Sequence, residues 1–398
     1  MDMADRVRNT KGGNMTNTDM RDADTAKRPV VGRFAPSPTG RMHLGNIFAS
    51  LAAWLAVRSN GPDARLVLRI EDIDRPRAVE DADRWIMDDY SWLGLDWDGE
   101  PVYQSQRGDV YERALRAVAS RVVDGERLAF PCFCTRRELR AASAPQESDG
   151  FVLYPGTCRR FASVPRETVD VPDLSARHSV RLAMPREGNP WGRVVFDDDV
   201  YGRQAWSLPR QVGDIVIRRS DGVFAYQLAV VADDLAQGVT QVVRGRDLLR
   251  STAAQIWLRE AITGCFGEDP ARIRGRTGVG ADAAGGRTSA SAGNASALVS
   301  VDYAHLPLLR TPAGARLAKR DKSMEVATVR GAGVRPEQVI GYCAWLLGLE
   351  EGAEPEPCAA GDCVGGFSWD RVRRSRWGVE DRVLERRALE VDWWRSWR

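Results

Sequence analysis

Three things are scarce in this chain of 398 residues: long apolar runs, an excess of charge of either sign, and histidine. No stretch of about 18 apolar residues occurs, which argues against a membrane-spanning helix. The first residues mix acids with bases and have no apolar core, so we expect a disordered tail over 1–28 and not a targeting peptide. The 57 basic and 55 acidic residues neither require nor exclude a nucleic-acid partner.

Cysteine is present seven times, and three of the seven lie close together in the sequence. An odd number in a long chain favours a reducing compartment, and we expect a cytoplasmic protein. Cys132, Cys134 and Cys158 form a set of soft ligands typical of zinc, whose structural sites take four ligands. No histidine lies between them, so Tyr154 is the nearest candidate for the fourth ligand. The alternative is three buried cysteines that act as small apolar residues.

The order of apolar patterns predicts an α/β fold. Apolar strands are predicted at 29–35 and 65–70, each followed by a helical pattern, at 43–59 and 79–93. This alternation is typical of a parallel sheet with crossover helices. Further on, strands are predicted at 214–219, 223–231 and 239–244, and helices at 110–123, 251–262 and 336–347.

The corner between the first predicted strand and helix carries the most specific pattern. The stretch from Ala35 to Asn46, APSPTGRMHLGN, places a bend rich in proline and glycine directly before a histidine and a helix start. A helix N-terminus offers unpaired N–H groups and a partial positive charge, so this corner suits a phosphate group. Taken alone, the pattern also fits a tight turn closed by a histidine cap.

Eight segments together resemble the glutamyl group of class I aminoacyl-tRNA synthetases. APSPTG with HLGN resembles the first signature of the class, and RLAKRDKS, from Arg316 to Ser323, resembles the lysine-bearing second one. Between them, in the family's order, lie RIEDID, LGLDWD, YQSQR, FAYQLAVVADD, VVRGRDLL and HLPLL. The resemblance implies a Rossmann-like parallel sheet with an inserted zinc-binding subdomain and a small helical C-terminal region.

The resemblance also implies a reaction and a set of site residues. ATP and an amino acid would form an aminoacyl-adenylate, with His43 and Lys319 as catalytic groups. The residues expected to bind ATP, with Mg²⁺, are His43, Leu44, Gly45, Asn46 and Lys319. Those expected to bind L-glutamate are Arg33, Phe34, Ala35, Pro36, Ser37, Glu71, Tyr226 and Arg244. Glu71 would hold the ammonium, while Arg33 and Arg244 would meet carboxylates, because a guanidinium fork suits them.

Several of these residues also fit purely structural roles. Lys319 fits the role of a solvated lysine in a loop, Arg244 fits a structural ion pair, and Tyr226 fits packing against the sheet. The second signature departs from the family's usual form, because Arg316 stands where lysine is common and Ala318 replaces a serine. Arginine keeps the charge but not the geometry of lysine. These departures bear on the rate of the reaction more than on its type.

The length of chain after the second signature narrows the expectation. The sequence ends 75 positions after Ser323, too few for a further domain of roughly 100 residues. This length and the C-x-C…Y-x-x-x-C pattern resemble a branch of the family that lacks the anticodon-binding domain. The resemblance implies that the expected partner is the anticodon loop of tRNA(Asp), where glutamate is transferred to queuosine at the wobble position. The rivals are a truncated synthetase that charges tRNA(Glu), a related ligase that acts on a small molecule, and a non-catalytic RNA-binding paralogue.

We divide the chain accordingly and expect a monomer. The tail is followed by the first half of the catalytic domain, 29–108, the inserted zinc subdomain, 109–205, and the second half of the catalytic domain, 206–266. A flexible insertion is expected at 267–300, where glycine, alanine and serine dominate. The lysine-signature loop and a helical region occupy 301–350, and an irregular tail 351–398. The arginine and tryptophan of that tail fit either an RNA contact or an extension with no set role.

Overall fold

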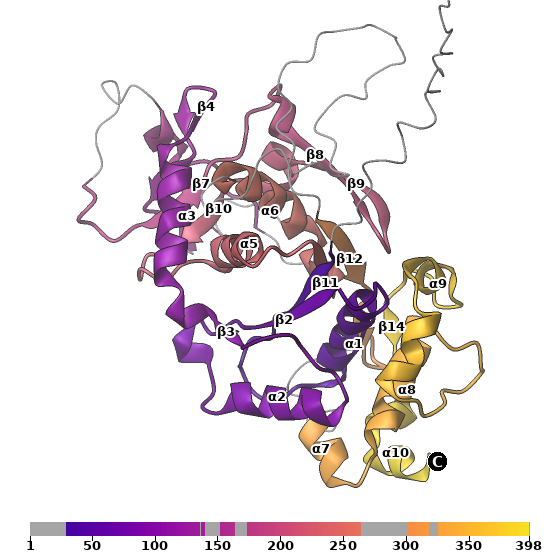
Figure 1. The fold of residues 1–398 in the computed structure, drawn as a ribbon. Coiled ribbons are helices and arrows are strands. Elements are labelled where there is room, and N and C mark those ends of the chain that lie inside the picture. The colour runs from indigo at the N-terminus through magenta and orange to yellow at the C-terminus, as the bar shows by residue number, and fades with distance from the viewer. Residues whose placement is uncertain are drawn as a thin grey trace, which may run out of the picture.

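A computed structural model describes residues 29–135, 137–139, 152–163, 173–263, 301–317 and 325–397. The predicted tail, the predicted insertion and Lys319 lie outside the described residues. No helix in these ranges is long and apolar enough to cross a bilayer. Figure 1 shows the arrangement of the elements.

Parallel strands form the centre of the molecule. The strands β1 (Val31–Phe34), β2 (Arg65–Ile70) and β3 (Val102–Tyr103) pair in that order, all parallel. The strands β11 (Gln241–Gly245) and β12 (Asp302–Leu306) are also parallel to each other. The Thr240 N–H donates to the Val31 carbonyl at 2.9 Å and so joins β1 to the segment entering β11. The α/β class expected from the sequence is confirmed.

Helix α1 (Leu44–Arg58) packs against this sheet on one side and against α8 (Pro336–Leu347) on the other. It has almost no exposed face, and Leu51, Leu55 and Val57 are fully buried. A Cβ atom at Gly32 on β1 would lie 2.4 Å from Val57 Cγ2, so glycine is needed for this close approach. Helix α2 (Ala82–Trp92) follows β2.

A second core lies among α3 (Gly108–Ser120), α5 (Tyr226–Ala236) and α6 (Leu249–Ile262). The strand predicted at 223–231 is wrong, because α5 begins within it. All residues from Leu228 to Leu235 are buried between neighbouring helices and the sheet. A helix buried on all sides gives no periodic pattern, so its apolar run is indistinguishable from that of a buried strand.

The inserted subdomain is a small antiparallel sheet of β6 (Ala129–Cys132), β7 (Ser179–Leu182) and β10 (Ile215–Arg218), with β7 in the middle. A short hairpin of β4 (Val122–Val123) and β5 (Glu126–Arg127) precedes it. The strands β8 (Arg193–Asp198) and β9 (Gly202–Ser207) form a hairpin that falls mostly within the range expected for this subdomain, 109–205, but β8 pairs with β12 of the catalytic sheet.

The segment from 351 to 397 is folded, in contrast to the irregular tail expected from its sequence. It forms α9 (Trp369–Arg374), β14 (Arg382–Val383) and α10 (Val391–Ser396), which lie with α7 (Val326–Gly331) beside α8 (Figure 1). Trp394 is buried, and Trp377 packs edge-on against Trp345 of α8. The tryptophans offset the entropy of ordering this segment by burying large apolar surfaces.

One carboxylate ties this segment to the catalytic domain. Asp381 accepts hydrogen bonds from Arg246 Nε at 2.5 Å, from Arg310 Nε at 2.5 Å and from the Leu308 N–H at 3.0 Å. Directly after it, β14 pairs in parallel with β13 (Leu309–Arg310). The C-terminal segment therefore supports the end of β11 and the loop after β12.

Candidate active site

A cavity of about 480 Å³ opens where β1, β2 and β11 end, next to the start of α1. Most of the residues expected to bind substrates line it, although they come from four separate segments of the chain. They are Arg33, Phe34, Ala35, Pro36, Ser37, His43, Gly45, Asn46, Glu71, Tyr226 and Arg244. Leu44 does not line the cavity, because its side chain is buried in the core below.

Arg33 projects from β1 and is almost fully buried. Its Nη1 donates to the Val243 carbonyl at 3.0 Å, and its Nε lies 3.9 Å from Asp234 Oδ1. That Nε has no hydrogen-bond partner among the described residues. Burial lowers the pKa of Arg33, against the opposing effect of Asp234. A buried guanidinium with an unused donor favours an anionic ligand.

Arg69, on β2, is fully buried and contacts Glu71. Its Nη1 donates to Asp234 Oδ1 at 2.7 Å, and its Nη2 donates to Glu71 Oε1 at 3.3 Å. Burial opposes the charge of Arg69, but the carboxylates of Asp234, Glu71 and Asp233 outweigh it and raise its pKa. Burial raises the pKa of the Glu71 carboxyl, while Arg69 and Arg33 oppose that shift. Glu71 is thus held in place by a charged partner and has one oxygen beyond that contact.

Arg244 enters from β11 and is also buried. Its Nη2 donates to Thr252 Oγ1 at 2.7 Å, and its Nε donates to His305 Nε2 at 3.1 Å. Within the described part of the chain, its Nη1 has no hydrogen-bond partner. One arm of the guanidinium is therefore fixed by the protein, and the other is a donor beside the cavity.

His43 caps helix α1 by a reciprocal pair of hydrogen bonds. Its Nδ1 accepts from the Gly45 N–H at 3.1 Å, and Asn46 Oδ1 accepts from the His43 N–H at 3.1 Å. An accepting Nδ1 places the ring proton of neutral His43 on Nε2. A Cβ atom at Gly45 would lie 3.1 Å from His43 Cε1, so glycine leaves room for the ring to lie over the first turn.

Residues before the central stretch of the second signature line the cavity, and residues after it contact the start of α1. Arg316 and Leu317 line it, and Arg316 Nη1 donates to Asp247 Oδ2 at 2.8 Å. Glu325 forms a β-bridge with His43, and the Val326 N–H donates to the Met42 carbonyl at 2.9 Å. Lys319 itself lies outside the described residues.

A second cavity, of about 890 Å³, adjoins the first and shares Ser37, Thr39, Glu71 and Tyr226 with it. It extends to the inserted subdomain, where Cys134 lines it. Its wall carries both charges and an aromatic ring: Arg77, Arg177, Arg181, Arg219, Asp72, Asp74, Asp221 and Phe224. The sequence did not indicate this cavity, because its lining comes from segments that meet only in the fold.

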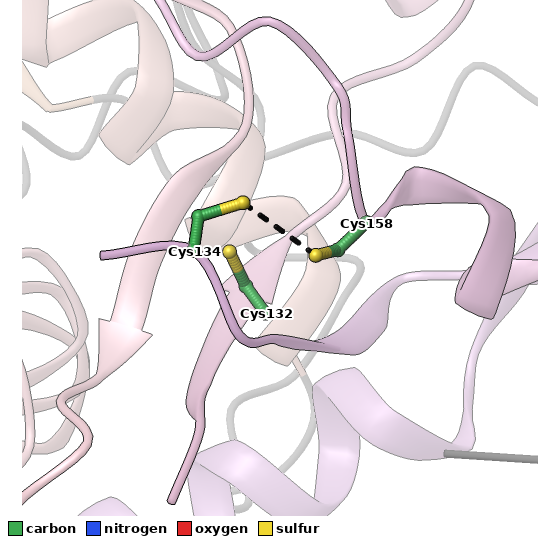
Figure 2. A group of neighbouring side chains, drawn as sticks. All are labelled: Cys132, Cys134 and Cys158. Atoms are coloured by element: carbon green, nitrogen blue, oxygen red, sulfur yellow. Dashed lines mark hydrogen bonds between the residues drawn. The ribbon is translucent and has the colours of Figure 1, made fainter. Parts of the chain in front are cut away.

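The predicted cysteine cluster is present as a group. Figure 2 shows the sulfurs of Cys132, Cys134 and Cys158 pointing toward one another from two segments of the inserted subdomain. All three sulfurs lie within 4.8 Å of one another, and those of Cys134 and Cys158 are 3.6 Å apart. Sulfurs around a tetrahedral zinc ion are ~3.8 Å apart, because each Zn–S bond is about 2.3 Å. The spacing therefore fits a metal ion held by three thiolates.

Tyr154 completes the surroundings of the cluster. Its hydroxyl lies 3.6 Å from Cys132 Sγ and accepts the Cys158 N–H at 2.7 Å. The guanidinium of Arg181 stacks 3.8 Å from the centre of its ring. Burial opposes ionisation of Cys132, but hydrogen bonds from Tyr154 and Arg181 outweigh it and lower the pKa of this thiol. Burial and the neighbouring sulfurs raise the pKa of Cys134 to about 11.

Several residues of the site's supporting network carried no predicted role: Arg69, Asp233, Asp234, Asp198, Thr252 and His305. Four of them lie in quoted motifs, namely Arg69 in RIEDID, Asp233 and Asp234 in FAYQLAVVADD and His305 in HLPLL. The signal that could have found the acids is their place directly after an apolar run, since a charge inside a buried element needs a partner. Asp198 and Thr252 carry no comparable signal.

Comparisons of the sequence with known proteins find a family of synthetases. The family model of class I (E and Q) tRNA synthetases, catalytic domain, matches residues 29–267. The chain is 40% identical to a glutamyl-Q tRNA(Asp) synthetase of Nitratidesulfovibrio vulgaris over 348 residues, which cover 85% of this chain and 92% of the relative. It is 39% identical to the enzyme of the same name from Symbiobacterium thermophilum, covering 87% and 94% of the two chains.

Solved structures agree at the level of the fold. A glutamate tRNA ligase from Elizabethkingia meningosepticum, in complex with its amino acid, aligns with a TM-score of 0.65 at 24% identity, over 92% of this chain and 68% of that one. The glutamate-tRNA synthetase of Elizabethkingia anophelis aligns with a TM-score of 0.66, also at 24% identity, over 92% and 70% of the two chains. The identity and coverage of the sequence matches assign the chain: it belongs to the glutamyl-Q tRNA(Asp) synthetase family, within the class I (E and Q) tRNA synthetases.

Proposed function

We propose that this chain activates L-glutamate with ATP, without tRNA, and then transfers the glutamyl group to queuosine at the wobble position of tRNA(Asp). The observation that carries the proposal is the pair of buried arginines at one cavity, Arg33 and Arg244, each with a donor that no described residue uses. Glutamate brings two carboxylates, which is the number of anionic groups that such a pair can hold.

The amino acid would lie at the buried end of the cavity. The ammonium group would face Glu71, whose carboxylate is fixed by Arg69. The side-chain carboxylate would meet Nη1 of Arg244, and the reacting carboxylate would be directed toward the start of α1, with Arg33 beside it. Tyr226 lines both cavities.

The nucleotide, as its magnesium complex, would lie over His43 and the first turn of α1. An oxygen of the glutamate carboxylate attacks the α-phosphorus of ATP, and pyrophosphate leaves. Negative charge gathers on the phosphates in that step, so donors aimed at them lower the barrier. His43 Nε2–H, the amides that start α1 and Lys319 would supply these donors, with the backbone N–H, not the side chain, as the contribution of Leu44.

The acceptor would enter through the second cavity. A hydroxyl of the cyclopentene ring of queuosine attacks the glutamyl carbonyl, an ester forms, and AMP leaves. Arginine side chains suit the phosphates of an RNA loop, and a ring such as Phe224 suits a base turned out of the stack. Both cavities share Glu71 and Tyr226, so an acceptor in the second cavity would approach the amino acid beside these two residues.

The cysteine cluster would hold a structural zinc ion through Cys132, Cys134 and Cys158, with Tyr154 as the fourth ligand. Such an ion would join the strand β6 to the segment before residues 159–162 and would shape one wall of the second cavity. A bound ion of this kind contributes folding free energy and no reactive water. The cytoplasmic location and monomeric state expected from the sequence stay predictions.

Two assays on the purified chain test the proposal. The first is exchange of labelled pyrophosphate into ATP without tRNA, which we expect to depend on glutamate and not on glutamine. The second is transfer of labelled glutamate to tRNA(Asp), which we expect with queuosine-bearing tRNA and not with queuosine-free tRNA. No exchange with glutamate would favour a non-catalytic paralogue. Charging of tRNA(Glu) at its terminal ribose would favour a truncated glutamyl-tRNA synthetase.

A further inference from the structure

A buried histidine of unassigned role lies directly behind Arg244. His305 is on β12, and the parallel register places it opposite Arg244 on β11. It is fully buried, and its Nε2 lies 3.1 Å from Arg244 Nε and 3.1 Å from Thr252 Oγ1. The guanidinium is therefore held at two of its three nitrogens, while its Nη1 has no partner among the residues described.

The other ring nitrogen of His305 fixes its tautomer. Asp198 Oδ2 lies 2.6 Å from Nδ1, and Asp198 Oδ1 accepts from the Val200 N–H at 3.0 Å and the Tyr201 N–H at 2.9 Å. An aspartate that accepts all these bonds requires the imidazole proton on Nδ1. Nε2 then carries a lone pair and accepts the Nε–H of Arg244. Each hydrogen bond in the series from Asp198 through His305 to Arg244 therefore joins one donor to one acceptor.

The hydroxyl of Thr252 also acts as an acceptor toward Arg244. It accepts Arg244 Nη2–H at 2.7 Å and lies 3.2 Å from the Leu248 carbonyl, to which it can donate its own proton. Burial lowers the pKa of His305 to about 4, against the opposing effect of Asp198. The imidazole is therefore neutral at neutral pH and retains the lone pair that Arg244 uses.

We propose that His305, oriented by Asp198, is a positioning residue that locks the guanidinium of Arg244 so that Nη1 faces the side-chain carboxylate of glutamate. This inference rests on the proposed function and adds a determinant of glutamate affinity that makes no contact with substrate. Without this hydrogen bond, the Arg244 side chain would sample more rotamers. The entropy lost in ordering it would then reduce the free energy of glutamate binding.

Asp198→Asn is the sharpest variant because it keeps the shape. The Val200 and Tyr201 N–H groups require an acceptor at Oδ1, and the His305 N–H, which lies 3.1 Å from Oδ2 and 3.3 Å from Oδ1, keeps only Oδ1. The new amide nitrogen therefore takes the place of Oδ2 and donates to His305 Nδ1. The ring proton then moves to Nε2 and faces the Nε–H of Arg244, donor against donor. We expect the KM for glutamate to rise about 10- to 100-fold, with the KM for ATP unchanged.

His305→Gln and His305→Phe form a matched pair. The glutamine side chain can present an oxygen to Arg244 Nε, whereas phenylalanine fills the space and presents none. We expect His305→Gln to stay within a few-fold of the unmodified chain and His305→Phe to resemble Asp198→Asn. His178→Gln, in the inserted subdomain, is the control and should leave both KM values unchanged.

The readout is the KM for glutamate and for ATP in pyrophosphate exchange, with thermal unfolding of each variant. A selective rise of the glutamate KM in Asp198→Asn and His305→Phe, with recovery in His305→Gln, supports the proposal. Equal changes in both KM values, or wild-type glutamate KM in His305→Phe, overturn it. If Asp198→Asn does not fold, the His305 pair decides. Failure of the unmodified chain to exchange with glutamate would instead refute the proposed function.

Discussion

The two ends of the first cavity are built differently. At the end proposed to bind glutamate, called the glutamate end, Arg33, Arg69 and Arg244 are buried, and each is held by partners from other strands and helices. At the end proposed to bind the nucleotide, called the nucleotide end, His43 and Asn46 bond to each other within one helix turn, and Arg316 is 59% exposed. The difference teaches that the buried arginines are positioned by contacts between distant segments, whereas the helix cap at the other end lies within one short sequence motif.

The largest effect is expected from a substitution at the glutamate end. Arg244→Met removes the only charge proposed to meet the side-chain carboxylate and leaves that carboxylate unpaired in a buried place. We expect kcat/KM for glutamate to fall about a thousandfold, on the order of 4 kcal/mol, with the KM for ATP unchanged. Pyrophosphate exchange measures both constants, and Arg193→Met, at an exposed position of β8, is the control. An equal loss for the two substrates would remove the contrast between the ends.

A smaller effect should follow from a change at the nucleotide end. Gly45→Ala places a Cβ 3.1 Å from the ring of His43 and displaces the ring from the helix start. We expect the exchange rate to fall about tenfold because ATP is positioned less well, with glutamate binding unchanged. Titration with glutamate by calorimetry measures the effect on glutamate binding, and exchange rates at saturating glutamate measure the effect on the use of ATP. Gly331→Ala adds the same methyl group in α7, where no atom lies within 4 Å, and should have no effect.

Asp381→Asn asks how far the glutamate end depends on the C-terminal segment. Burial opposes the ionised form, but hydrogen bonds from Arg246, Leu308 and Arg310 outweigh it and lower the pKa of Asp381. A carboxyl with a lowered pKa stabilises the fold above its ordinary pKa, and this contribution is lost as the pH falls below about 4. We expect Asp381→Asn to lose about 2 kcal/mol at pH 7.

Unfolding of the unmodified chain and of Asp381→Asn from pH 7 to pH 3 checks this linkage. The difference in unfolding free energy should shrink as the pH falls below about 4. The glutamate KM at 25 °C should change less than twofold, because the network around Arg244 does not include Asp381. A constant difference over this pH range would contradict the assignment of the ion pairs to Asp381.

The smallest effect on glutamate activation is expected from the cysteine cluster, which contacts neither end. Removal of bound metal by a chelator, or Cys158→Ser, should lower the melting temperature by several degrees. Exchange with glutamate should remain within about twofold, while transfer to tRNA should fall more, because Cys134 lines the second cavity. Metal analysis of the purified chain gives the stoichiometry. A folded, metal-free chain with full transfer activity would rule out the zinc site.

The contrast between the two ends also explains what the sequence could predict. His43, Gly45 and Asn46 lie within four consecutive positions, so one motif contains the whole helix cap. Arg33, Glu71, Tyr226 and Arg244 were found by resemblance, and the structure places them at one cavity. The supports of Arg244 include Asp198 and Thr252, which are ordinary surface-type residues in the sequence. Pairing of β8 with β12 brings Asp198 behind Arg244, and the packing of α6 brings Thr252 there.

The C-terminal segment was misjudged for a physical reason. Its tryptophans and arginines alternate without helical period, and an irregular, solvated tail is the usual meaning of that pattern. In the structure Arg382 is buried and donates to the Leu346, Trp377 and Gly378 carbonyls, at 3.1, 3.0 and 3.0 Å. A buried arginine whose partners are backbone carbonyl groups, one of them on the distant helix α8, leaves no periodic signal.

The most direct test of the central claim is a crystal structure of the chain with a non-hydrolysable glutamyl-adenylate analogue. We predict the glutamyl side-chain carboxylate at about 3 Å from Arg244 Nη1 and the adenylate beside His43. An analogue bound outside the cavity, or bound in it with the glutamyl side chain directed away from Arg244, would contradict the account.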